Sequence, residues 1–180
     1  QMVLSAFLHA NDCEMDSCAD LGPPAAHNPS FFNVLAEHGY GTAFLCATAY
    51  PDRPILRLLE KSLPPLAKTR DFADLLSAFE ARSASGPFAI YVWSQVPHVN
   101  ANLALAGHAV GLHDLFAGSA ATADNLLGAL VEILRRHGIL DDTTIVAYGD
   151  HGDELWTHGF KFGLMHGIEP YMPLVHTPLV

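Results

Sequence analysis

The segment Thr143-Thr-Ile-Val-Ala-Tyr-Gly-Asp-His-Gly-Asp153 decides how the chain is interpreted. Its first half is apolar and β-branched, which is typical of a buried strand. This run leads directly into Asp150 and His151, which stand between two glycines. In open α/β sheets, ligands bind just beyond the carboxyl ends of the strands. The position therefore predicts that these two side chains belong to a binding site.

Asp150 and His151 are residue types that bind divalent metal ions. Carboxylate oxygen and neutral imidazole nitrogen both suit zinc or manganese, and carboxylate alone suits calcium or magnesium. The flanking glycines allow a sharp backbone turn where a larger side chain would obstruct the ion. The same dipeptide also fits an ordinary loop with two polar residues, so on its own it leaves both interpretations open.

The residues around this segment extend the pattern. An amphipathic helix precedes it, and the neighbouring phrases are Gly138-Ile-Leu-Asp-Asp-Thr-Thr144, His158-Gly159, His166-Gly167, Glu169-Pro-Tyr171 and Thr177-Pro-Leu-Val180. This order resembles the second half of the sulfatase and alkaline-phosphatase superfamily. The nearest look-alikes are arylsulfatase-like hydrolases and the phosphoethanolamine or phosphoglycerol transferases. The chain departs from that pattern at Gly149, where the family usually has serine, and at Thr177, where it usually has valine.

A second phrase, Asn33-Val-Leu-Ala-Glu-His-Gly-Tyr-Gly-Thr-Ala-Phe44, resembles the helix-strand unit that follows the nucleophile in those enzymes. A competing alignment begins at His27 and places Tyr50-Pro-Asp-Arg53 against the C-x-P-x-R segment of sulfatases, with Ala49 at the position of the nucleophile. We prefer the first alignment because its phrase is the more specific. Neither alignment identifies a convincing nucleophile in this sequence.

The resemblance implies roles for four of these residues. Asp150 and His151 match ligands of one catalytic divalent ion, which would be zinc, manganese or calcium. His166 matches a histidine that contacts metal or substrate phosphate, and His158 lies in a neighbouring family motif. Because the pKa of an ordinary imidazole lies near neutrality, both histidines are candidates to protonate a leaving alkoxide.

Two further residues are candidates for binding the substrate. His98 follows a predicted strand and Pro97, and the resemblance implies contact with the oxyanion of an ester. Lys161 would pair with an anionic substrate, as a lysine does in sulfatases. Without the alignment, a loop histidine and a surface lysine are the simpler interpretations.

The implied function is a metal-dependent hydrolase or transferase acting on sulfate or phosphate esters. Two protein ligands are few for catalytic zinc, which usually has three. The strand with an acidic ligand and the nucleophile segment are also not recognised, although Asp12 or Asp16 is a weak ligand candidate. The alternatives are a non-catalytic, sulfatase-like binding module that lacks the nucleophile, and a two-metal relative such as a phosphomutase.

The expected fold is α/β, with a mostly parallel central sheet flanked by helices, as in alkaline phosphatase. We expect one sulfatase-like domain over residues 1–180 that is incomplete, because it is a fragment of a larger enzyme. Omitted segments or a degenerate family member would also explain the missing parts. The predicted strands are 2–9, 41–47, 88–94, 143–148 and 173–180. The predicted helices are 31–38, 55–62, 72–82 and 119–137, with an N-cap at Asp71 and C-terminal glycines at Gly39 and Gly138.

The composition limits the classes of molecule that the chain can bind. The chain has 180 residues, half of them hydrophobic, and a net charge of −10, which argues against nucleic acid. A small anionic ester stays compatible with this charge, because the charge of a bound ion dominates locally.

No apolar run is long enough to span a bilayer, and Gln1 to Ala10 lacks the features of a signal peptide. The resemblance implies a periplasmic, secreted or membrane-associated location outside the cytoplasm. The sequence does not decide whether Cys13 and Cys18 form a disulfide.

Overall fold

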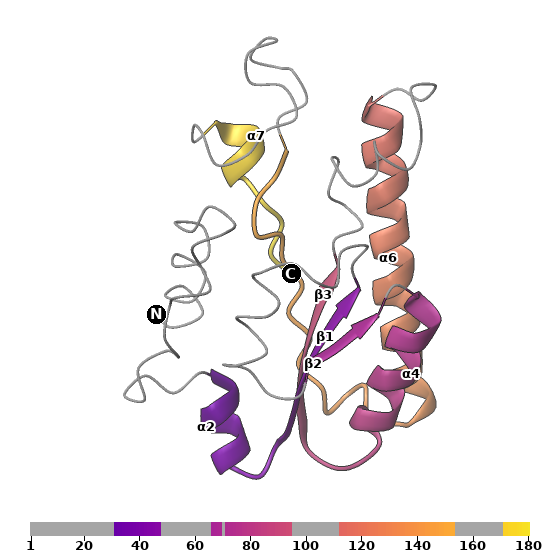
Figure 1. The fold of residues 1–180 in the computed structure, drawn as a ribbon, viewed down its shortest axis with the longest axis vertical. Helices are drawn as coiled ribbons and strands as arrows, with labels where there is room; N and C mark the ends of the chain where they lie inside the picture. The colour runs from indigo at the N-terminus through magenta and orange to yellow at the C-terminus, as the bar shows by residue number, and fades with distance from the viewer. Residues whose placement is uncertain (1–30, 48–65, 70, 95–111, 154–170) are drawn as a thin grey trace. The chain divides into compact units, whose positions relative to one another are not determined.

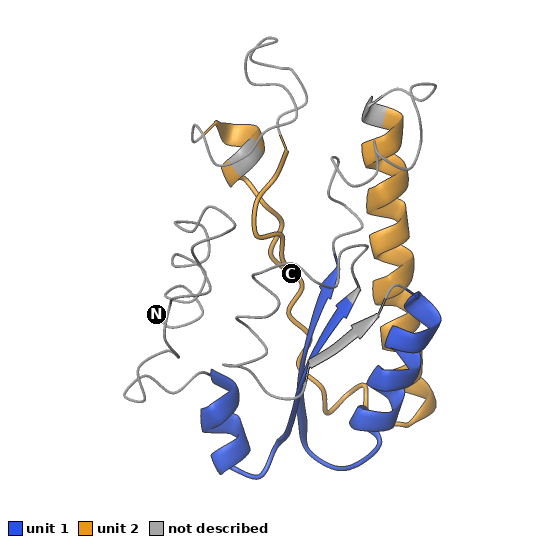
Figure 2. Ribbon diagram, in the orientation of Figure 1, with its two compact units in different colours: residues 1–94 blue, residues 95–180 orange. Residues whose placement is uncertain are grey.

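The computed structural model describes residues 31–47, 66–69, 71–94, 112–153 and 171–180. They belong to two compact units, residues 1–94 and residues 95–180 (Figure 2). The strand predicted at 2–9 and the helix predicted at 55–62 lie outside the described residues.

The first unit contains a parallel three-stranded sheet (Figure 1). Its strands are β1 (Gly41–Ala47), β2 (Leu66–Thr69) and β3 (Phe88–Ser94), in the order β2-β1-β3. The predicted strands 41–47 and 88–94 are therefore confirmed, and so is their parallel arrangement. β2 was not predicted. Its sequence, Leu-Ala-Lys-Thr, is short and lacks a distinctive apolar pattern, so pairing with β1 determines its structure.

The central strand β1 forms the core of this unit. Four successive residues, Ala43 to Cys46, are at most 4% exposed, so both faces of the strand are covered. This is the burial expected of a central parallel strand. Phe44 lies opposite Tyr91 in the register, and their rings stack with centroids 5.1 Å apart. Such aromatic pairs across neighbouring strands stabilise a sheet beyond simple burial.

Helix α4 (Phe72–Ser83) packs against all three strands and lies along one face of the sheet (Figure 1). Leu75, Phe79 and Ser83 are its buried residues, and their spacing of four places them on one face. The helix begins as predicted, because the side chain of Asp71 accepts a hydrogen bond of 2.8 Å from the backbone N–H of Ala73.

Helix α2 (Phe31–Glu37) precedes β1 and contacts it. Gly39 follows the helix with a φ of 84°, a conformation that glycine adopts without strain. The backbone N–H groups of Gly39 and Tyr40 donate to the carbonyls of Ala36 and Leu35, which completes a Schellman motif. The predicted helix end at this glycine is confirmed.

Helix α6 (Leu112–Arg136) is the main element of the second unit. It begins seven residues before the predicted start at Ser119, because the Ala- and Gly-rich sequence there hides the helical period. Its end is as predicted: Gly138 has a φ of 68°, and the N–H of Ile139 donates to the carbonyl of Leu134. The buried residues of the helix are Leu115, Ser119, Leu126, Leu130, Ile133 and Leu134.

Residues 143–148 and 173–180 were predicted as strands, and neither forms a full strand in the described structure. They meet in one isolated antiparallel bridge, Tyr148 to Leu179. Residues Met172–Val175 form a short helix, α7, with Pro173 in its first turn, where proline is tolerated. Residues 143–146 form no strand pairing with the described residues, and Val146 is 61% exposed.

Candidate functional site

Asp150 and His151 follow the point where two segments of the second unit pair. Ala147 and Val180 exchange two backbone hydrogen bonds of 2.9 Å, and the N–H of Gly149 donates to the carbonyl of Pro178 at 3.2 Å. These bonds hold the chain up to Gly149, and the dipeptide comes directly after it. The two residues were predicted at the end of a buried strand; they instead follow an exposed segment that pairs with residues 178–180 through one isolated antiparallel bridge.

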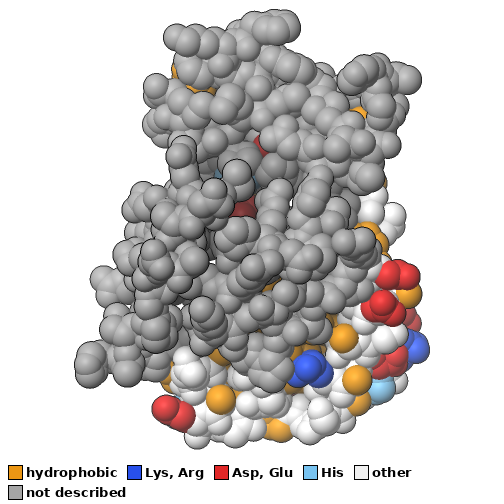
Figure 3. Space-filling view, in the orientation of Figure 1, with side chains coloured by type: hydrophobic (Ala, Val, Ile, Leu, Met, Phe, Trp, Pro, Cys, Tyr) orange, Lys and Arg blue, Asp and Glu red, His pale blue; other side chains and the backbone are white. Residues whose placement is uncertain are grey.

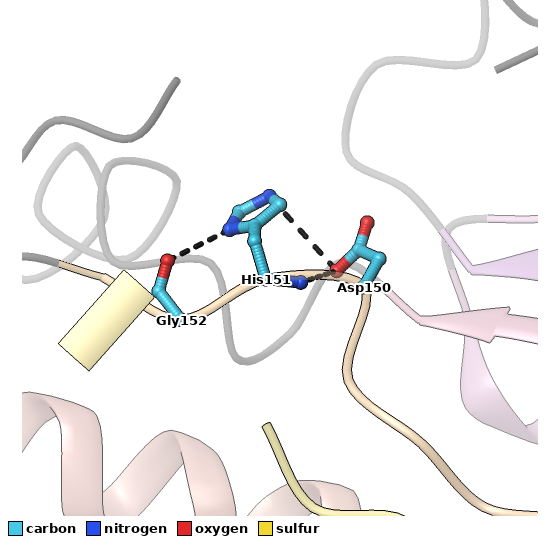
Figure 4. Close-up of polar contacts among 3 residues, drawn as sticks. All are labelled: Asp150, His151 and Gly152. Atoms are coloured by element: carbon cyan, nitrogen blue, oxygen red, sulfur yellow. Dashed lines mark hydrogen bonds and ion pairs between the residues drawn. The ribbon is translucent and has the colours of Figure 1, made fainter. Parts of the chain in front are cut away.

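The carboxylate of Asp150 is oriented by its neighbour. Its Oδ1 accepts a hydrogen bond of 3.0 Å from the backbone N–H of His151. The side chain of Asp150 is 37% exposed and that of His151 is 30% exposed, so both can be reached by a ligand. Figure 4 shows the carboxylate and the imidazole ring on the same side of the backbone.

The imidazole of His151 is oriented by the residue after it. Its Nδ1 lies 2.8 Å from the carbonyl oxygen of Gly152 (Figure 4). A carbonyl oxygen only accepts hydrogen bonds, so this contact places a proton on Nδ1. In the neutral ring the lone pair is then on Nε2, the atom that lies 3.9 Å from Asp150 Oδ1. Backbone carbonyls commonly fix the tautomer of metal-binding histidines in this way.

This arrangement fits part of a site for a divalent cation. Asp150 and His151, whose Oδ1 and Nε2 lie 3.9 Å apart, would be the residues that hold such an ion, and the ion would supply positive charge there. Within the described ranges, however, no group of three or more His, Cys, Asp or Glu side chains is placed to hold a metal. Asp150 and His151 are therefore two candidate ligands, and the described residues place no third beside them.

The remaining predicted site residues are His98, His158, Lys161 and His166. All four lie outside the described residues, so their roles stay predictions. The open question of a disulfide between Cys13 and Cys18 also lies there. Cys46 is described, and it is buried in β1.

Two features of the site were not predicted from the sequence. One is the carbonyl of Gly152, whose contact with His151 depends on local backbone geometry rather than on residue type. The other is Thr177, whose side chain lies next to Gly149. Gly149 and Thr177 are also the two positions at which the sequence departs from the family pattern. This shared departure was the signal in the sequence that could have singled out Thr177.

On the face seen in Figure 3, acidic and basic side chains lie side by side along one edge, among uncharged and hydrophobic ones. None of the helices in the described part of the chain is long and apolar enough to cross a membrane.

The comparisons with known proteins agree with the sequence pattern. A protein-family model, Sulfatase, matches residues 1–180, and no curated protein matches the chain. Members of this family hydrolyse ester substrates, generally use a divalent metal, and are often extracytoplasmic or lysosomal. The α/β architecture of the described residues, a parallel sheet with flanking helices, is consistent with this assignment. The chain belongs to the sulfatase family.

Proposed function

We propose that this chain is a metal-dependent hydrolase or transferase domain for sulfate or phosphate esters. The observation that carries the proposal is the pair formed by Asp150 Oδ1 and His151 Nε2, which lie 3.9 Å apart with the lone pair of the ring on Nε2. Both side chains are partly exposed, and both follow a paired backbone segment that fixes their position. We assign Asp150 and His151 as two ligands of zinc, manganese or calcium.

The family match over residues 1–180 supports treating the chain as one sulfatase-like domain. When bound, the divalent ion supplies positive charge against the negative charge that develops on an ester oxygen. In this proposal His98 and Lys161 bind the anionic group of the ester. His158 and His166 supply protons, so that the leaving alkoxide departs as an alcohol. The family also supports a location outside the cytoplasm.

The test measures cation binding and ester hydrolysis by the full chain. Titration with Mn²⁺ and Zn²⁺ is followed by calorimetry in the wild type and in Asp150→Asn and His151→Gln. Loss of one ligand leaves the ion with a poorer site, and we expect affinity to fall by a factor of about 10 to 100. The matched controls Asp142→Asn and His137→Gln change exposed residues outside the pair, and they should bind as the wild type does.

Hydrolysis of p-nitrophenyl sulfate and p-nitrophenyl phosphate separates the two ester classes. An enzyme is expected to turn over at least one of them, and to lose that activity in Asp150→Asn. Cation binding without turnover of either ester would favour the alternative, a non-catalytic binding module of the sulfatase family. Wild-type affinity in both ligand variants would refute the assigned metal site.

A further inference from the structure

The residue before the dipeptide, Gly149, has unusually little room for a side chain. A Cβ atom placed on Gly149 would lie 3.3 Å from Cβ of Thr177 and 3.5 Å from its Cγ2. The first distance is tighter than ordinary contact between carbon atoms. The same Cβ would lie 3.6 Å from the carbonyl oxygen of His151. A side chain added at position 149 would therefore press against Thr177.

Backbone hydrogen bonds between the two segments hold this contact in place. Thr177 precedes Pro178, whose carbonyl accepts the hydrogen bond from the N–H of Gly149. Two residues further along each segment, Ala147 and Val180 exchange their pair of backbone bonds. This pairing keeps the backbone of Thr177 close to that of Gly149, and Gly149 is joined directly to Asp150.

We propose that Thr177 is a positioning residue for the Asp150–His151 pair. Its side chain packs on the backbone of Gly149 and so sets where the carboxylate and imidazole are presented. The proposal rests on the proposed function, because it takes that pair as the working part of the site. It adds a residue from a separate segment of the chain.

The primary test is independent of any metal. Backbone amide shifts of Asp150 and His151, together with the ring nitrogen shifts of His151, are measured by NMR in the metal-free full chain. Gly149→Ala adds a methyl group against Thr177, and Thr177→Ala removes the Cγ2 and hydroxyl groups. We expect both variants to shift these signals, while signals from β1 and β3 stay unchanged. The double variant Gly149→Ala/Thr177→Gly should return the signals toward the wild type, because loss of Cβ at position 177 gives the added methyl group room.

Thr177→Val is the matched control, because it keeps the shape of the side chain and removes only the hydroxyl group. We expect its site signals to resemble those of the wild type. Equal shifts in Thr177→Val and Thr177→Ala would overturn the proposal, since they would make the hydroxyl rather than the packing responsible. Unchanged signals in Thr177→Ala would also overturn it, and this variant stays informative even if Gly149→Ala fails to fold.

Cation affinity is the second readout. We expect Gly149→Ala to bind Mn²⁺ about 10-fold more weakly than the wild type, with most of the loss recovered in the double variant. Wild-type affinity in Gly149→Ala would contradict the positioning role. If the wild-type chain binds no cation, the proposed function fails, and the metal-free spectra still decide whether Thr177 positions the pair.

Discussion

The segment through β1 and the segment before Asp150 have similar apolar sequences and different environments. In β1, residues Ala43 to Cys46 are at most 4% exposed, because strands pair on both sides and α4 covers one face. In the other segment Ile145 is 39% and Val146 is 61% exposed, and pairing with described residues begins only at Ala147. An apolar run becomes a buried strand only where neighbouring segments cover it. The first region forms a buried core, and the second leads into the two proposed metal ligands.

Truncating the core strand tests this contrast with the largest expected effect. Leu45 is 1% exposed, so Leu45→Ala leaves a cavity and should lower the free energy of unfolding by about 2 to 5 kcal/mol. Val146→Ala removes an exposed side chain and should change it by less than about 0.5 kcal/mol. Urea denaturation measures both. Equal losses in the two variants would show that residues 143–148 are buried as deeply as β1.

Breaking the backbone pairing behind the site should have a smaller and more local effect. Val180→Pro removes the N–H that donates to Ala147 and should cost about 1 kcal/mol. The amide signals of Asp150 and His151 should shift, while those of β1 should not. Hydrogen exchange of the Ala147 amide, faster in the variant, reports the loss of pairing directly. An unchanged exchange rate would mean that this pairing does not hold the segment.

A substitution in the first unit should lower the stability of the protein without affecting the candidate site. Asp71→Ala removes the N-cap of α4 and should destabilise the protein by about 1 kcal/mol. Cation affinity should be unchanged, because Asp71 has no part in presenting Asp150 or His151. Asp71→Asn keeps a capping oxygen and serves as the control. A parallel loss of affinity in Asp71→Ala would show that the stability of α4 and the site are coupled.

The smallest effect is expected at an exposed ion pair on α6. Arg135 pairs with Glu132 one helical turn earlier, and both side chains are more than half exposed. Arg135→Gln should change the free energy of unfolding by less than about 0.5 kcal/mol and leave cation affinity unchanged. Thermal unfolding at low and high salt provides the measurement. A clear, salt-dependent loss of stability would contradict the expected weakness of this pair.

Local patterns predicted the sheet unit well. The apolar runs of β1 and β3, the cap at Asp71 and the glycine after α2 all signal structure through residues close in sequence. β2 was not predicted, because its conformation depends on pairing with β1 rather than on its own composition. The early start of α6 was missed because small residues carry little periodic signal.

For the candidate site, residue type and position identified Asp150 and His151 without any structure. Their arrangement could not be predicted in the same way. The tautomer of His151 depends on the carbonyl of Gly152, and the position of Gly149 depends on Thr177 and Pro178, nearly thirty residues away in the sequence. The first contact depends on the local backbone conformation and the second on tertiary structure, and the residue types around Asp150 determine neither.

The most direct test of the proposed site is the ¹⁵N NMR spectrum of the His151 ring, recorded with and without Zn²⁺ on the full chain. His151→Gln assigns the signals. We expect a proton on Nδ1 in the metal-free neutral ring and a large shift of Nε2 alone when the cation binds. A proton on Nε2, or ring signals that do not respond to saturating Zn²⁺, would contradict the claim that Asp150 and His151 form a metal site.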